Sequence, residues 1–149
     1  MSHLPEIPEG KYTISYQNPS SATRYHVANN GTSGLYGSTN ASDAVVLTVN
    51  KLYDVKGMIT LSFTDSSTEP PQVYTVSNNG NFGLYGTSSA SAAIGIGTSA
   101  IQADGSGYVC FLYQGQLLEN NIYDTQATTG IGLRSNTSAS GTVFLFSPA

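Results

Sequence analysis

The chain is poor in the residues that provide charge, disulfides or metal ligands. Charged residues make up 9% of its 149 residues, with five Lys and Arg together and a formal net charge of -4. Because so few basic side chains cannot neutralise a run of phosphates, we expect no nucleic-acid partner. The single cysteine, Cys110, has no disulfide partner in the chain, and its place in an apolar run predicts an inert, partly buried thiol. A chain of this length buries enough apolar surface to fold without disulfides or metal.

The start of the chain and its hydropathy show two further absences. The first ten residues lack the basic and apolar regions of a signal peptide, and no stretch approaches the ~20 apolar residues of a membrane span. We therefore expect no membrane span and a protein that is cytoplasmic or leaves the cell by an unconventional route.

Catalytic and metal-binding patterns are absent as well. The histidines are His3, in an N-terminal tail, and His26, beside the apolar Val27. No histidine pair, Cys-x-x-Cys or acidic cluster has the spacing of metal ligands, and no glycine-rich loop precedes a helix. We expect no metal, no cofactor and no enzymatic activity.

What the chain does contain is Ser, Thr, Asn, Gly and Tyr in abundance, arranged in three copies of one pattern 49 residues apart. The first two copies share Asn-Asn-Gly and, shortly after it, Gly-Leu-Tyr-Gly. Three steps of 49 account for 147 of the 149 residues, so the repeats predict one domain, 1–149, with copies at about 9–55, 56–104 and 105–149. The positions that recur in all three copies include Tyr25, Tyr74 and Tyr123; Gly34, Gly83 and Gly132; and Leu35, Leu84 and Leu133.

Each copy reads as four strands. Alternation of β-branched and aromatic residues predicts a half-buried first strand, and an Asn-Gly turn joins the second and third strands in copies one and two. The third copy has Ala127 to Gly130 at this turn, which predicts a hairpin of another type. The first strands carry Tyr12, Ile14 and Tyr16; Ile59, Leu61 and Phe63; and Val109, Phe111 and Tyr113. The fourth strands carry Val45 and Leu47, Ile94 and Ile96, and Val143 and Leu145 on one face.

No segment shows a useful helical period, so the fold class is all-β. Twelve strands in three sequential units favour a β-trefoil, in which the first and fourth strands of each unit form a six-stranded barrel and the other two form a hairpin. A β-prism is the alternative.

A family resemblance supports this prediction. The segment Ile7-Pro-Glu-Gly-Lys-Tyr-Thr-Ile14 resembles the opening of mushroom β-trefoil lectins, and the apolar Val143-Phe-Leu-Phe146 would close the barrel. The resemblance implies a ricin-B-like architecture over the whole chain. The chain has no Trp, so the Gln-x-Trp motif of ricin-type lectins is absent, and their ligand residues do not transfer.

Recurring tyrosines and amides have structural and functional interpretations. Tyr25, Tyr74 and Tyr123 fit core packing, and the repeated Asn-Asn-Gly fits turn geometry, although paired amides also bind sugar hydroxyls. Tyr36 and Tyr85 follow the repeated Leu and therefore face away from it, so each ring is a candidate to stack on a sugar.

The first candidate sugar site lies at the end of the third strand. It comprises Tyr36, Gly37, Ser38, Asn40 and Asp43. The glycines are expected to leave ring and backbone open to a ligand, and Asp43 either accepts hydrogen bonds from vicinal hydroxyls or is a turn residue.

The same alignment predicts two further sites, neither of which has an acid. The second copy offers Tyr85, Gly86, Thr87 and Ser88, and the third offers Arg134, Ser135 and Asn136. Because Arg134 replaces the tyrosine, the third site is either degenerate or altered in preference.

Three functions fit these features. The first is a non-catalytic lectin with up to three weak glycan sites, whose partners are neutral sugars, glycoproteins or glycolipids. The second is a protease inhibitor acting through the loop Thr64–Gln72, which Pro70 and Pro71 stiffen. The third is a protein-interaction or structural module. The low charge would also permit a homodimer.

Overall fold

The computed structural model shows an all-β protein, as the sequence predicted. Twelve strands and two short 3-10 turns lie in the described residues, and no α-helix does. The described residues are 7–17, 23–29, 34–52, 58–65, 69–78, 83–104, 106–114, 118–124, 133–136 and 142–149.

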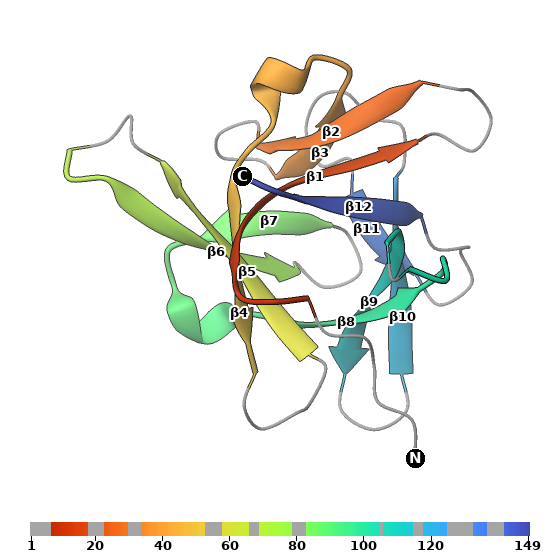
Figure 1. Ribbon diagram of the computed structural model, residues 1–149. Helices are drawn as coiled ribbons and strands as arrows, with labels where there is room; N and C mark the ends of the chain where they lie inside the picture. Colours follow the sequence, from red (N-terminus) through yellow and green to blue (C-terminus); the bar gives the residue numbers. More distant parts are fainter. Residues whose placement is uncertain are drawn as a thin grey trace.

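Six strands form a closed antiparallel barrel (Figure 1). They are β1 (Gly10–Gln17), β4 (Leu47–Lys51), β5 (Met58–Asp65), β8 (Gly95–Ala100), β9 (Tyr108–Gln114) and β12 (Val143–Pro148). Each pairs with the next in this order, and β12 pairs with β1. Because the ring closes on itself, these strands present no free edge.

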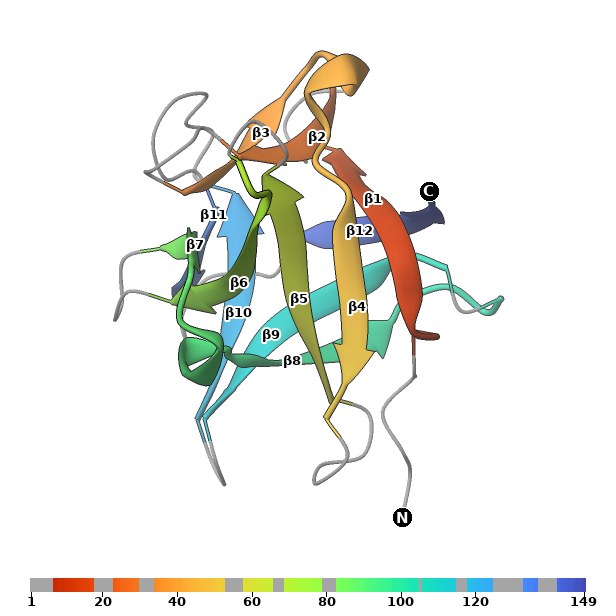
Figure 2. The same ribbon diagram turned by 90° about the vertical axis from the view of Figure 1, so that its left-hand side faces the viewer.

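The other six strands form three hairpins attached to the barrel. They are β2 (Arg24–Asn29) with β3 (Leu35–Ser38), β6 (Gln72–Asn78) with β7 (Leu84–Thr87), and β10 (Leu118–Asp124) with β11 (Leu133–Asn136). β2 extends the sheet from β1, β6 from β5 and β10 from β9. In Figure 2 the first hairpin lies above the upright barrel strands β1, β4 and β5. A 3-10 turn follows β3 (η1, Ala41–Asp43), and another follows β7 (η2, Ala90–Ala92).

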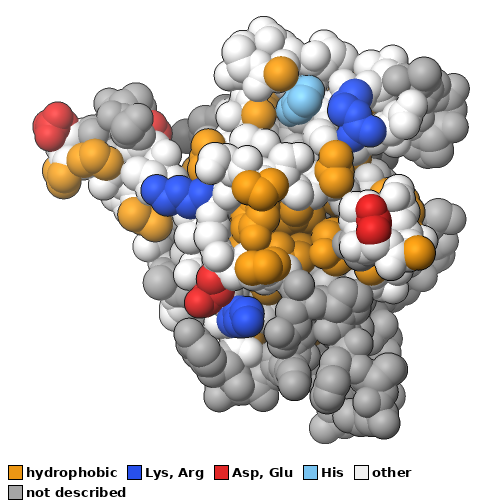
Figure 3. Space-filling view, viewed as in Figure 1, with side chains coloured by type: hydrophobic (Ala, Val, Ile, Leu, Met, Phe, Trp, Pro, Cys, Tyr) orange, Lys and Arg blue, Asp and Glu red, His pale blue; other side chains and the backbone are white. Residues whose placement is uncertain are grey.

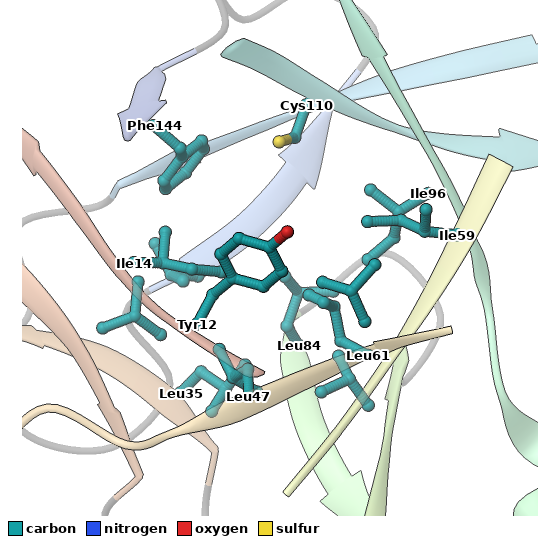
Figure 4. Close-up of a cluster of buried hydrophobic side chains, with 14 of the residues drawn as sticks. Tyr12, Ile14, Leu35, Leu47, Ile59, Leu61, Leu84, Ile96, Cys110 and Phe144 are labelled. Atoms are coloured by element: carbon teal, nitrogen blue, oxygen red, sulfur yellow. The ribbon is translucent and has the colours of Figure 1, made fainter. Parts of the chain in front are cut away.

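The core fills the barrel and the space beneath the hairpins. Alternating residues of β1 and β5 point inward as predicted, and Figure 4 shows several of them meeting side chains from β3, β4, β7, β8, β9 and β12. The interior holds an apolar cavity of about 30 Å³. Eleven side chains line it, among them Val27, Leu84, Cys110 and Phe146, and none of the eleven is polar.

The third copy differs from its predicted strand phase. Val143 and Leu145 share a face, but each is 38% exposed, whereas Phe144 between them is 3% exposed. Of the β9 side chains that the structure describes, Cys110 is buried and Val109 is half-buried, so Val109 does not have the inward position that was predicted for it. β12 pairs with β1 so that Phe144 lies opposite Tyr16, and antiparallel partners share a face. The side chains of Phe111 and Tyr113 lie outside the described residues.

Strand pairing within the hairpins shows that the third copy departs from the 49-residue spacing. The repeated leucine lies opposite Asn29 in the first hairpin and opposite Asn78, 49 residues later, in the second. In the third hairpin it lies opposite Asp124, which follows Asn78 by 46 residues. The third hairpin therefore has a different register. The Asn30-Gly31 and Asn79-Gly80 turns and residues 125–132 lie outside the described residues.

Candidate functional site

The first hairpin has an inner and an outer face because successive strand residues alternate. Leu35 is buried against the core, so Tyr36 points to the outer face, as predicted. Tyr36 lies opposite Ala28 in the β2–β3 ladder, is itself half-buried, and Ala28 is 1% exposed. Tyr36 therefore keeps part of its surface exposed on this face, beside the buried Ala28.

The glycines beside the two tyrosines have a packing role that the sequence did not predict. A Cβ on Gly37 would overlap the hydroxyl of Tyr16, and one on Gly86 would lie 2.6 Å from Cζ of Phe63. Tyr25 stacks on Tyr16 with ring centroids 5.6 Å apart, and the corresponding pair in the second copy is also 5.6 Å apart. Gly37 and Gly86 thus admit stacked aromatic pairs on the inner face, and Gly37 itself is buried whereas Gly86 is half-buried.

Asp43 is held in place by a short hydrogen-bond network. Ser38 Oγ donates to Asp43 Oδ2 at 2.7 Å, and the Asn40 backbone N–H donates to Ser38 Oγ at 3.1 Å. Asn40 Oδ1 accepts from both the backbone N–H and the hydroxyl of Ser42, at 3.1 and 2.8 Å, and so caps η1. Ser38 is buried, whereas Asn40 and Asp43 are exposed. The network therefore orients an exposed carboxylate.

The carboxylate of Asp43 can accept further hydrogen bonds from a ligand. An ionised carboxylate has about four acceptor positions, and the Ser38 hydroxyl occupies one of them. Both interpretations of Asp43 are therefore compatible, because the residue ends a 3-10 turn and also presents acceptors to solvent.

His26 belongs to this surface, and sequence reasoning missed it. It lies opposite Ser38 in one ladder and opposite Ser15 in the other, so these three residues form a row across β1, β2 and β3. Arg24, two residues before His26 and therefore on the same face, donates from Nη1 to Ser15 Oγ at 3.0 Å. The strand register from the predicted hairpin would have located His26 beside Ser38, but His26 was considered only as a catalytic or metal-binding residue.

The second hairpin repeats this construction without charge. Tyr85 is half-buried on the outer face, and the Ser89 backbone N–H donates to Thr87 Oγ1 at 3.2 Å, as Asn40 does to Ser38. The hydroxyls of Ser89 and Ser91 lie 3.0 Å apart at the position of the Asn40 cap. Ser88 is exposed. The position corresponding to Asp43 is Ala92.

The third predicted site is known only by its backbone. Arg134 lies opposite Tyr123, Ser135 opposite Ile122, and Asn136 opposite Asn121. The side chains of Arg134, Ser135 and Asn136 lie outside the described residues, as do residues 137–141. In the first two copies the structure places the tyrosine and the residue two positions later on the outer face, the glycine on the inner face, and the other predicted residues in the loop after the strand. The third set is described only by its strand pairing.

The described residues show no pattern of a metal site or a membrane-spanning helix. Within the described part of the chain, no group of three or more His, Cys, Asp and Glu residues is placed to hold a metal ion. No described helix has the length and hydrophobicity needed to cross a membrane.

The structure describes part of the predicted inhibitory loop, Thr64–Gln72. Glu69 and Pro70 are exposed, and residues 66–68 lie outside the described residues.

Comparison with known proteins adds no assignment. No protein-family model, no curated protein and no solved structure matches this chain.

Proposed function

We propose that this protein is a non-catalytic β-trefoil lectin that binds glycans on the outer faces of its hairpins. Three features support the trefoil topology: the closed six-stranded barrel, its composition from the first and fourth strands of each predicted unit, and the hairpin attached to each first strand. The uncharged polar composition supports a sugar as ligand, since hydroxyls and amides match its hydrogen-bonding groups.

The observation on which the proposal rests is the juxtaposition of Tyr36 and a pre-oriented Asp43. Tyr36 and Ser38 lie two residues apart on one face of β3, and Ser38 holds the carboxylate of Asp43. A tyrosine ring stacks on the apolar face of a sugar, while a carboxylate accepts hydrogen bonds from vicinal hydroxyls. Holding the carboxylate before binding reduces the entropy lost when the sugar docks.

The second hairpin provides a weaker counterpart. Tyr85 replaces Tyr36 on the outer face, and Thr87, Ser88 and Ser89 offer hydroxyls where the first copy offers Asn40 and Asp43. Shallow sites of this kind bind single sugars weakly. Two or more of them on one molecule bind a glycan-coated surface more tightly through avidity.

A glycan array tests the proposal. We expect the wild-type protein to bind a defined set of glycans and Tyr36→Ala to lose at least about fivefold in signal, because stacking contributes on the order of 1 kcal/mol. Tyr85→Ala should reduce binding less, and the double variant should abolish it.

The matched control is Ile101→Ala, which removes exposed apolar surface between β8 and β9, outside the three hairpins. This variant should bind like the wild type. Far-UV circular dichroism and urea unfolding confirm that each variant is folded. Strong array binding that is unchanged in both tyrosine variants would refute these sites, and a blank array with folded protein would refute the lectin function.

A further inference from the structure

The two hairpin faces share one scaffold but differ at three outward positions, two of which carry a formal charge on the first face. Strand register makes them equivalent: His26 lies between Ser15 and Ser38, and Thr75 lies between Ser62 and Thr87. The same register matches Arg24 with Val73, because they lie opposite Gln17 and Thr64, the second residues after Ser15 and Ser62. The loop position Asp43 corresponds to Ala92.

The difference is confined to the surface. Tyr36 and Tyr85, the glycines that follow them and the hydrogen bond that starts each 3-10 loop are retained. Arg24 is exposed and His26 is half-buried, while Val73 at the arginine position is 54% exposed. An exposed valine at this position shows that the fold does not require the arginine there.

The charges on the first face are separated into two ends. Arg24 binds Ser15 on β1, whereas Asp43 binds Ser38 on β3, two strand spacings or about 10 Å away. His26 lies between them on β2. Figure 3 shows a histidine and a Lys or Arg side chain exposed near one another on this side of the molecule.

From this arrangement we infer that the first hairpin face binds an acidic sugar, whose carboxylate lies at Arg24 and His26 and whose hydroxyls lie at Asp43. The inference rests on the proposed lectin function and names the ligand class of its first site. The Arg24 guanidinium has five N–H donors, and the bond to Ser15 uses one of them. An imidazole N–H of His26 adds a donor beside it, and charge-assisted bonds to a carboxylate are stronger than neutral ones.

The end of the face at Asp43 prevents the acidic sugar from binding in the reverse orientation. The carboxylate of Asp43 repels an anionic group and accepts hydrogen bonds from hydroxyls, so the ligand docks in one direction. The second face, with Val73, Thr75 and Ala92, has none of these charges and takes a neutral sugar.

The test uses matched glycans that end in glucuronic acid or in glucose, which differ only in the carboxylate. In Arg24→Val/His26→Thr the first face receives the residues of the second face. We expect this variant to lose about threefold to tenfold in binding of the acidic glycans and to keep its binding of the neutral ones. The reciprocal Val73→Arg/Thr75→His should gain binding of the acidic glycans.

Salt provides a second measurement. Raising the ionic strength should reduce the wild type's preference for acidic glycans, whereas Arg24→Val/His26→Thr should show no such preference at either ionic strength. Binding of glycans with no acidic preference, or a preference that survives in this variant, overturns the inference while the lectin function stands. Absence of binding to every glycan by the folded protein overturns both.

Discussion

A side chain at Gly37 or Gly86 would collide with an aromatic ring of the barrel. Each glycine lies where the outer hairpin passes over a stacked pair, Tyr16 with Tyr25 or Phe63 with Tyr74. The requirement is steric at both positions. The repeated Gly-Leu-Tyr-Gly therefore combines a core leucine, an outward tyrosine and a glycine that lets the hairpin approach the barrel.

Gly37→Ala should lower the free energy of unfolding by about 1–3 kcal/mol, because overpacking a well-filled site forces neighbouring side chains from their rotamers. Gly86→Ala should act in the same direction, since its Cβ would lie 2.6 Å from Cζ of Phe63. Urea unfolding followed by circular dichroism measures both.

Two controls accompany this prediction. Thr39→Ala, at an exposed position two residues along, should change stability by no more than about 0.5 kcal/mol. Adding Tyr16→Phe to Gly37→Ala should recover part of the loss, because it removes the hydroxyl that the new Cβ overlaps. An unchanged unfolding midpoint in both glycine variants would show that the hairpins do not approach the barrel this closely.

At the scale of the element, the phase of β12 decides which side chains enter the core. Its apolar run Val143-Phe-Leu-Phe146 has no polar residue to mark an outer face. The ladder with β1 places Phe146 opposite Ile14 and Phe144 opposite Tyr16, both of which face inward. Phe144 then packs edge-on against Tyr16, with ring centroids 5.4 Å apart.

A pair of neighbouring substitutions tests this phase. Phe144→Ala should cost about 3–5 kcal/mol, because it removes a buried ring and leaves a cavity. Leu145→Ala, one residue along on the outer face, should cost only about 0.5 kcal/mol. Thermal or urea unfolding of the two variants gives the comparison, and similar losses, or a larger one for Leu145→Ala, would reverse the assigned phase.

At the scale of the whole molecule, the barrel encloses an apolar interior. The reactivity of Cys110 therefore indicates whether solvent and reagents reach that interior. The thiol is 4% exposed and lines the cavity shared by strands from all parts of the chain. Burial raises the pKa of Cys110 from 9.0 to about 12. Because the thiolate is the reactive form, the folded protein should not react with thiol reagents at pH 8.

Labelling of Cys110 should therefore follow global unfolding. We expect a chromogenic disulfide reagent to react only at urea concentrations that also abolish the circular dichroism signal. A rapid reaction with the native protein would show that the barrel opens locally.

The same shift predicts a pH effect with a definite sign. The pKa of Cys110 is higher in the folded state, so its contribution to stability is complete below pH 9 and is lost as pH rises through about 12. The free energy of unfolding of the wild type should therefore fall relative to that of Cys110→Ala over this range. A constant difference between the two proteins would contradict the buried thiol.

Local sequence patterns were sufficient to predict the fold class, the strands of the first two copies and the outward position of Tyr36. These properties depend on period-two alternation over a few residues, such as Tyr12, Ile14 and Tyr16, which is readable without a partner strand. For Cys110 the apolar neighbours predicted a partly buried thiol, and the structure buries it to 4% exposure.

Tertiary structure decided the properties that depend on register between distant segments. In β9 and β12 both alternate sets consist mostly of apolar residues, so pairing with β1 and β8 selects the inward residues. The steric role of Gly37, the bond from Ser38 to Asp43 and the place of His26 beside Ser38 likewise arise where separate elements meet. The alternation within one strand has the same period in either phase, and a shift of one residue exchanges the buried and exposed faces.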